Sequence, residues 1–162
     1  MLEVQITKEM IENATTRALA IGSLNNSIRL GKGNLVGCLG EAIVLSTLDN
    51  ATLANTYDYD IIVDGLKLDV KTKERTVVPK SHYECSVANF NTKQKCDHYV
   101  FVSILVEKRI PKMGYILGYI SKENFYEKAS FHNKGELDER NNFTFTANCY
   151  NIEIHKLNSW ED

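Results

Sequence analysis

The amino-acid sequence predicts a single α/β domain over residues 1–162, with a central mixed β-sheet flanked by helices. Helical periodicity dominates the first part of the chain, and β-patterned segments follow from Thr56 to Ile120. With 162 residues and 43% hydrophobic content, the chain is large enough to bury one core without disulfides. We find no internal repeat, low-complexity tract or linker that would divide the chain.

The first predicted helix follows Thr7, whose hydroxyl is a good N-cap acceptor. Apolar residues recur at helical spacing from Met10 to Ile21, so we expect an amphipathic helix that runs to about Leu24. A polar, glycine-containing loop comes next and ends at Asn34, which we expect to be the N-cap of the following helix.

The second predicted helix, residues 35–48, is apolar nearly all round, which is typical of a buried helix. Glu41 is its only charged residue, and Gly37 and Gly40 beside it would let another backbone approach closely. A carboxylate in such a helix is costly unless it is paired, hydrogen-bonded or bound to a metal. We therefore expect Glu41 to be a metal ligand or, alternatively, to form an ion pair with a lysine.

Segments rich in β-branched and aromatic residues predict strands in the middle of the chain. Turn residues separate these segments, and a weaker alternation near the end predicts a terminal hairpin. The predicted elements are strands 56–63, 66–73, 82–87, 98–107 and 113–120, a short helix 122–129, a polar loop 131–142, and a hairpin of 143–147 with 150–155.

The dipeptide Asp64-Gly65 between the first two strands is a strong signal for a two-residue type I′ hairpin turn. Pairing Val63 with Leu66 then places Asp60 opposite Asp69. The same register places Asp58 opposite Lys71 and puts acids and lysines on one face. The other face carries the residues expected in the core: Tyr57, Tyr59, Ile61, Val63, Leu66, Leu68 and Val70.

Two carboxylates directly opposite each other destabilise a hairpin unless a positive group lies between them. Oxygen ligands of this kind suit Mg²⁺ or Mn²⁺, and Glu41 would supply a third carboxylate if its helix packs beside the hairpin. Divalent ions held by carboxylates promote phosphodiester hydrolysis, and Lys71 can orient the attacking water. The alternative is an ordinary sheet whose acid and lysine face is only solvated surface.

The overall charge of −2 neither favours nor excludes a nucleic-acid partner, but the segment 67–95 is locally basic. The alternative explanation of this local excess of basic residues is an ordinary solvent-exposed loop. We expect the four cysteines to be reduced and structural, and the four histidines lack metal-ligand spacing. Without a signal-peptide pattern or a long apolar run, we expect a cytoplasmic protein with no membrane partner.

These residues together resemble the PD-(D/E)XK nuclease superfamily, which has the restriction-endonuclease-like fold. Gly40-Glu41 resembles the leading glutamate of the family, Asp60 its motif aspartate, and Asp69-Val70-Lys71 its D/E-x-K tripeptide. The resemblance covers about residues 34–106, and small phage-borne members are similar over residues 34–44 and the hairpin. Tyr59 stands where the family often has a proline, and only residues 88–97 are available for the helix expected before the strand at His98.

The resemblance implies an Mg²⁺- or Mn²⁺-dependent enzyme that hydrolyses phosphodiester bonds, most simply a DNA endonuclease in a bacterial or phage-infected cell. Glu41, Asp60, Asp69 and the Val70 carbonyl would be metal ligands, and Lys71 would lie at the attacking water. Gln94 falls where some relatives have a polar residue facing the site, although an exposed helix glutamine is equally expected.

Two other functions stay open at this point. A nuclease-like fold can bind nucleic acid without cleaving it, and a small interaction protein can carry a solvated acidic hairpin. We also expect a homodimer, because a symmetric pair is the simplest way for so small a domain to cut both strands of a duplex.

Overall fold

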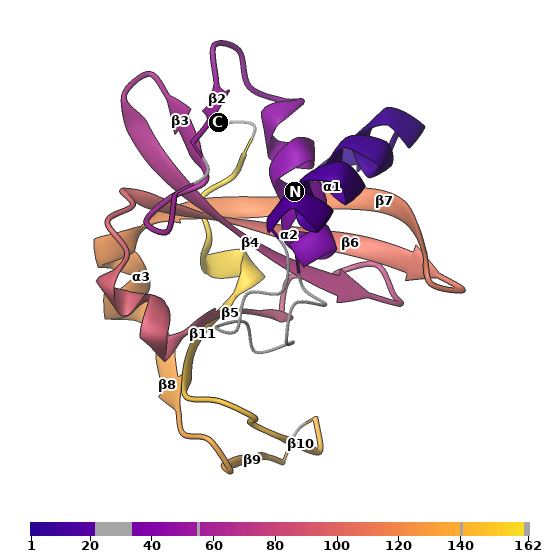
Figure 1. The fold of residues 1–162 in the computed structure, drawn as a ribbon. Helices are drawn as coiled ribbons and strands as arrows, with labels where there is room; N and C mark the ends of the chain where they lie inside the picture. The colour runs from indigo at the N-terminus through magenta and orange to yellow at the C-terminus, as the bar shows by residue number, and fades with distance from the viewer. Residues whose placement is uncertain (22–33, 55, 140, 161–162) are drawn as a thin grey trace.

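The computed structural model describes residues 1–21, 34–54, 56–139 and 141–160 of the chain. In this part the fold is mixed α/β, with three α-helices arranged around a large, curled, mixed sheet (Figure 1). The predicted class is therefore confirmed. The helices are α1 (Lys8–Ile21), α2 (Asn34–Leu45) and α3 (Lys122–Lys128).

The main sheet has six strands in the order β1-β7-β6-β4-β3-β2. Strands β4 and β6 are parallel, and every other neighbouring pair in this sheet is antiparallel. The strands are β1 (Leu2–Gln5), β2 (Thr52–Leu53), β3 (Ile61–Val63), β4 (Leu66–Arg75), β6 (His98–Glu107) and β7 (Ile110–Ser121).

The predicted start of α1 agrees with the structure, whereas α2 starts one residue earlier than predicted, with Asn34 inside the helix, and ends at Leu45 instead of Leu48. The backbone N–H of Met10 donates to Thr7 Oγ1 at 3.1 Å, which confirms Thr7 as the cap of α1, and α2 begins at Asn34. The predicted end of α1 near Leu24 and the polar loop before Asn34 lie outside the described residues.

The hairpin of β3 and β4 has the predicted register, with Val63 opposite Leu66 and Ile61 opposite Leu68. Asp64 and Gly65 have φ values of 48° and 83°, as a type I′ turn requires. Of the residues expected in the core, Ile61, Leu68 and Val70 are buried, whereas Tyr57 and Leu66 are exposed.

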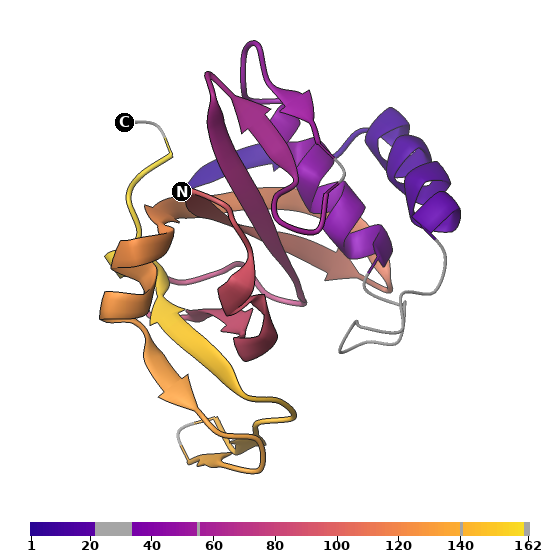
Figure 2. The same cartoon turned by 60° about the vertical axis from the view of Figure 1, so that its left-hand side comes forward.

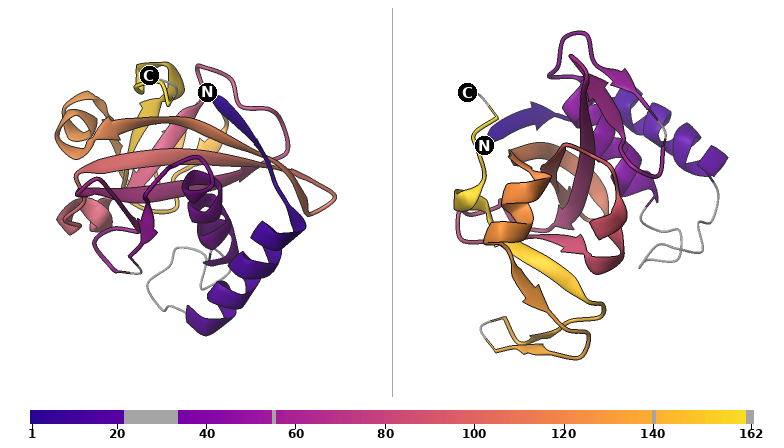
Figure 3. Two further views of the ribbon diagram at one scale, coloured as in Figure 1. Left: turned by 90° about the horizontal axis from the view of Figure 1, so that it is seen from above. Right: turned by 90° about the vertical axis from the view of Figure 1, so that its left-hand side faces the viewer.

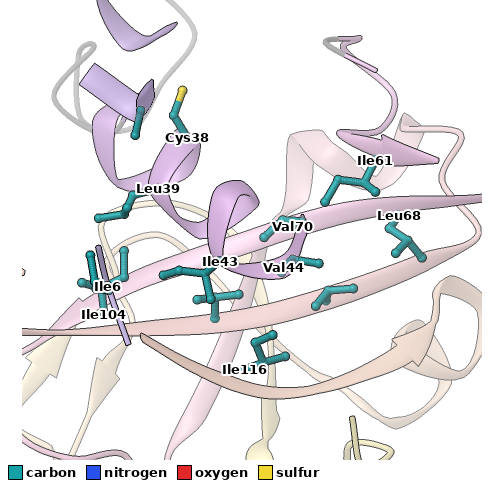
Figure 4. Packing of buried hydrophobic residues seen from close by; sticks show 13 residues of the cluster. Ile6, Cys38, Leu39, Ile43, Val44, Ile61, Leu68, Val70, Ile104 and Ile116 are labelled. Carbon is teal, nitrogen blue, oxygen red and sulfur yellow. The ribbon is translucent and has the colours of Figure 1, made fainter. Parts of the chain in front are cut away.

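Helices α1 and α2 cover one face of the main sheet, and α3 and the C-terminal strands cover the other (Figure 3). Figure 4 shows Ile43 and Val44 of α2 facing Val70 of β4 and Ile116 of β7, and Leu39 on the side of Ile6 and Ile104. The opposite face packs around aromatic residues: Tyr99, Phe101, Tyr115 and Phe125 are all buried there. The four cysteines are free, as predicted.

A second sheet of three strands in the order β5-β11-β8 extends away from the main sheet (Figure 2). Its strands are β5 (Glu84–Ala88), β8 (Ser130–His132) and β11 (Cys149–Glu153). The predicted terminal hairpin is wrong, because β11 pairs with β5 and β8. Strand β10 (Phe143–Thr144) pairs instead with β9 (Leu137–Asp138), inside the region predicted to be a loop.

The connection between the parallel strands β4 and β6 is longer than the sequence predicted. It spans residues 76–97, because β5 leaves the main sheet for the second one. The helix expected over residues 88–97 is a short 3₁₀ helix, η1 (Asn89–Lys93), and a further 3₁₀ turn, η2 (Ile154–Lys156), follows β11. The dozen or more residues that a crossover between parallel strands requires are therefore present.

Candidate metal centre

Helix α2 packs directly on the main sheet at Gly40. A Cβ atom added to Gly40 would lie 1.8 Å from Thr72 Oγ1, so only glycine lets α2 pack against β4 at this point. The predicted close approach is confirmed for Gly40 and wrong for Gly37, around which a Cβ would meet nothing within 4 Å. The next residue, Glu41, is thereby held beside β4.

Glu41 is half-buried, and its Oε2 lies 2.5 Å from Nη2 of Arg17 on α1. The ion pair weighed from the sequence therefore exists, with an arginine in place of a lysine. Burial raises the pKa of the Glu41 carboxyl, the Arg17 guanidinium opposes this, and the negative charge of Asp69 raises the pKa further. The charges of Arg17 on α1 and of Asp69 on β4 therefore both act on the Glu41 carboxyl.

The chain before β3 turns where the sequence predicted a strand from residue 56. The Thr56 hydroxyl donates to the Tyr59 carbonyl at 2.8 Å and accepts from the Tyr59 N–H at 3.0 Å. These bonds form a local turn where the sequence predicted a strand paired with β4. The predicted pairing of Asp58 with Lys71 is therefore wrong. Asp58 Oδ1 instead accepts from the Lys95 N–H at 3.2 Å.

Asp60 lies directly before β3 and is held by the backbone of β4. Its N–H donates to the Leu68 carbonyl at 2.8 Å, and its Oδ2 accepts from the Val70 N–H at 2.7 Å. Burial, followed by the charges of Asp69 and Glu41, raises the pKa of Asp60 to about 8, against the opposing effects of the Val70 N–H and Lys71. The three acids are therefore close enough to act on one another.

The Val70 carbonyl is directed toward the same edge of β4 as Asp60. Along a strand, the backbone groups of successive residues point to opposite edges. The Lys67 carbonyl accepts from Asp97 on the β6 side, and the Leu68 carbonyl accepts from Asp60 on the β3 side. Because Val70 is two residues beyond Leu68, its carbonyl points to the β3 side, where the predicted ligand set requires it.

Asp69 is only 2% exposed, so the alternative of a solvated acidic face is wrong for this residue. Its Oδ2 lies 2.5 Å from Lys71 Nζ but has no well-directed hydrogen bond in the described part of the chain. Its Oδ1 accepts from Gln94 Nε2 at 3.2 Å. Asp69 and Lys71 thus form a buried acid and lysine pair.

Gln94 directly follows η1 and is 7% exposed, so the alternative of an exposed helix glutamine is wrong. Its Nε2 donates to the Tyr57 carbonyl at 2.7 Å as well as to Asp69, and its Oε1 accepts from Lys71 Nζ at 3.2 Å. Lys122 Nζ donates to the Gln94 carbonyl. Gln94 therefore connects both members of the acid and lysine pair to the loop before β3.

The donor types suit a hard divalent cation, since three carboxylates and a carbonyl supply only oxygen. Asp69 Oδ2 is moreover buried, and among the described residues its close partner is the Lys71 ammonium at 2.5 Å, with no well-directed hydrogen bond. Among the described residues, however, no three His, Cys, Asp or Glu side chains are grouped closely enough to hold one ion. Glu41 is paired with Arg17, and Asp69 contacts Lys71 and Gln94. To bind an ion, both carboxylates would have to exchange these contacts for contacts with the metal.

Arg17 was not singled out from the sequence, although a signal was present. It is three residues after Ala14 and four before Ile21, so it falls on the apolar stripe of α1. A basic residue on a stripe that faces the protein interior indicates a buried acidic partner. Lys122 gave no such signal, because its helix is short and polar.

Comparison of the chain with models of known families, with curated proteins and with solved structures gives no match. In the described ranges, no helix has both the length and the apolar character needed to cross a membrane. The residues gathered here, Glu41, Asp60, Asp69, Lys71, Gln94 and Arg17, are therefore interpreted from their own geometry and charge. We refer to the first four of them as the acidic site.

Proposed function

We propose that the chain is an Mg²⁺- or Mn²⁺-dependent nuclease of the PD-(D/E)XK superfamily, most simply a DNA endonuclease. One observation carries the proposal: α2, the residue before β3 and β4 bring three carboxylates together, with Asp60 held by the Val70 N–H and Asp69 only 2% exposed. Burial, followed by the charges of Asp69 and Glu41, accordingly raises the pKa of Asp60 to about 8. Such a group of carboxylates, one buried and two partly buried, is costly without a function, and it is typical of a site that binds a cation.

The arrangement of the elements supports a restriction-endonuclease-like fold. Helix α2 precedes the antiparallel strands β2, β3 and β4, and β4 is parallel to β6. This is the order of helix, hairpin and returning strand that the resemblance implies. The crossover departs from it, since β5 and η1 stand where family members usually have an α-helix.

Glu41, Asp60, Asp69 and the Val70 carbonyl would hold the ion. When bound, a divalent cation stabilises the anionic phosphate and makes water more acidic. Asp60 keeps its position through the Val70 N–H, and Asp69 through Gln94. Lys71, whose ammonium group is held by Asp69 and Gln94, would neutralise phosphate charge and orient the attacking water.

The test is cleavage of supercoiled plasmid, linear duplex, single-stranded DNA and RNA in Mg²⁺, Mn²⁺ and EDTA. We expect metal-dependent cutting that is lost in Asp69→Ala and Lys71→Ala proteins. Asp64→Asn is the matched control, because Asp64 is an exposed acid in the same hairpin and asparagine tolerates its positive φ. Equal cutting by wild type and Asp69→Ala would contradict the proposal.

A fold that binds nucleic acid without cleaving it is the second candidate. The pairing of Glu41 with Arg17 and of Asp69 with Lys71 favours it, because both acids are neutralised without an ion. This candidate predicts equal nucleic-acid binding in EDTA and in Mg²⁺, no turnover, and a melting temperature that divalent metal leaves unchanged.

A further inference from the structure

We propose that the surface beside the acidic site binds unpaired nucleotides, with their bases stacked on the rings of Tyr57 and Phe90. We call these two side chains the aromatic pair. The proposal rests on the nuclease function proposed above and names its substrate class: single strands, or duplexes with unpaired nucleotides at the cleavage site.

The aromatic pair is exposed in a way that other aromatic side chains of the protein are not. Tyr57 is 63% exposed and Phe90 48% exposed, and neither makes a ring contact in the described part of the chain. Phe131 and Phe143 are exposed to similar extents, at 42% and 49%, but their rings pack on Tyr150 and Phe145. Tyr57 and Phe90 thus keep their ring faces available to a ligand.

Both members of the aromatic pair are linked to Gln94, one by a hydrogen bond and the other through the chain. The Tyr57 carbonyl accepts from Gln94 Nε2 at 2.7 Å, and Gln94 also contacts Asp69 and Lys71. Phe90 belongs to η1, the 3₁₀ helix that directly precedes Gln94. Figures 1 and 3 show the loop before β3 and η1 at the same end of the main sheet.

The charge of this surface complements a phosphate backbone. Lys93 and Lys95 are exposed on either side of Gln94, and the Lys67 ammonium lies 5.4 Å from the centre of the Tyr59 ring. Asp58 and Asp97 lie nearby, but one oxygen of each accepts from a backbone N–H, that of Lys95 and of Lys67 respectively. Among the described residues, Lys67, Lys93 and Lys95 form no ion pair, so their ammonium groups are available to phosphates.

The chemistry of stacking selects unpaired bases. In a duplex the faces of each base are covered by its neighbours, so an exposed aromatic ring finds no partner there. In a single strand the faces are free, and stacking tolerates any base because every base has a π-face. Two exposed rings linked to Gln94, with exposed lysines next to it in the chain, fit a strand that passes the acidic site with its bases turned toward the protein.

The experiment measures binding in EDTA, where cleavage cannot occur. The probes are a short labelled DNA strand, the RNA strand of the same sequence, and the DNA duplex, each followed by fluorescence anisotropy. We expect Tyr57→Ala and Phe90→Ala each to weaken binding of the single strands about tenfold, with little change for the duplex. Tyr57→Phe should bind like wild type, since it keeps the ring.

Phe143→Ala is the matched control, because it removes an exposed ring far from the acidic site. Unchanged single-strand binding in both Tyr57→Ala and Phe90→Ala would overturn the inference, and so would an equal loss of duplex binding. Metal-dependent cleavage separates the two proposals. Cleavage with normal single-strand binding in the variants refutes only the stacking surface, whereas selective loss of binding without any cleavage refutes only the nuclease.

Discussion

At the scale of single residues, the contacts of each charged side chain decide whether it belongs to the acidic site. Asp58 and Asp60 are two residues apart, yet Asp58 caps an exposed backbone N–H while Asp60 lies among other acids. In a strand that ran from residue 56, the alternation of side chains would place both acids on one face of the hairpin. The Thr56 side chain, which bonds twice to Tyr59, ends the alternation before it reaches Asp58.

The pKa of Asp60 predicts a pH dependence of stability. An acid whose pKa is raised in the folded state, here from 3.8 to about 8, ionises first in the unfolded chain. In EDTA, its contribution to the free energy of unfolding is therefore fully present below pH 4, falls as pH rises to about 8, and is level above that. Asp60→Asn should remove a decline on the order of a few kcal/mol.

Urea unfolding of wild type and Asp60→Asn in EDTA, at intervals between pH 4 and pH 9, measures this decline. Asp64→Asn serves as the control and should follow wild type, because Asp64 is exposed. Parallel curves for wild type and Asp60→Asn would show that Asp60 ionises normally and would remove the electrostatic argument for the acidic site.

Arg17 gives a second prediction at this scale. Arg17→Ala leaves the Glu41 carboxylate half-buried without its cation and should reduce stability by about 1–3 kcal/mol. If the acidic site binds metal, Mg²⁺ should raise the melting temperature of Arg17→Ala more than that of wild type, since the ion replaces the lost charge. Thermal melts with Mg²⁺ and with EDTA measure both effects.

The comparison variant is Lys8→Ala, which breaks an exposed pair between Lys8 and Glu12 on the same helix. Its stability should stay within about 0.5 kcal/mol of wild type, as surface pairs contribute little. A loss in Lys8→Ala as large as in Arg17→Ala would mean that the helix, rather than the buried pair, is being weakened.

At the scale of elements, local signals were predicted well and long-range pairing was not. The Asp64-Gly65 turn and the Thr7 cap are encoded within a few residues, and both formed as expected. Strand β1 was missed because its partner, β7, is more than 100 residues away in sequence. The alternation of apolar and polar residues in β1 indicates a strand, but it does not indicate which other strand pairs with it. For the same reason, β11 was assigned to the wrong hairpin.

The packing of α2 on β4 predicts that Gly40→Ala is severely destabilising. The new methyl group would lie within 3 Å of three Thr72 atoms, so α2 would have to move away from the sheet and take Glu41 with it. We expect a loss of about 1–3 kcal/mol or more in unfolding experiments.

Gly37→Ala is the control from the same helix, since its methyl group would meet nothing within 4 Å. Alanine there should be neutral or stabilise the protein by up to about 1 kcal/mol through helix propensity. Tolerance of Gly40→Ala would show that the close contact between α2 and β4 does not fix the position of Glu41.

At the scale of the whole molecule, the curled sheet separates two cores, and the acidic site takes residues from both of its sides. Glu41 comes from the helical layer, whereas Asp69 and Lys71 point to the face that carries Gln94 and Tyr99. The sequence predicted the acids and their order, and the resemblance offered Gln94 as a residue facing the site. Neither the contacts that Gln94 makes there nor the pairing of Arg17 with Glu41 was predicted. Those contacts depend on where the crossover and α1 pack, which no local pattern encodes.

One acidic site per chain has a consequence for duplex substrates. We expect a symmetric homodimer if both strands are cut together, and single nicks if the protein is a monomer. Sedimentation velocity at micromolar concentration, compared with the ratio of nicked to linear plasmid, tests this expectation. Simultaneous cutting of both strands by a monomer would contradict it.

Titration calorimetry with Mn²⁺ tests the central claim, that the acidic site holds a divalent cation, most directly. The proteins to compare are wild type, Asp69→Asn and the control Asp64→Asn. We predict one Mn²⁺ site in wild type and in Asp64→Asn, and loss of that site in Asp69→Asn. Absence of binding in wild type, or unchanged binding in Asp69→Asn, would contradict the claim.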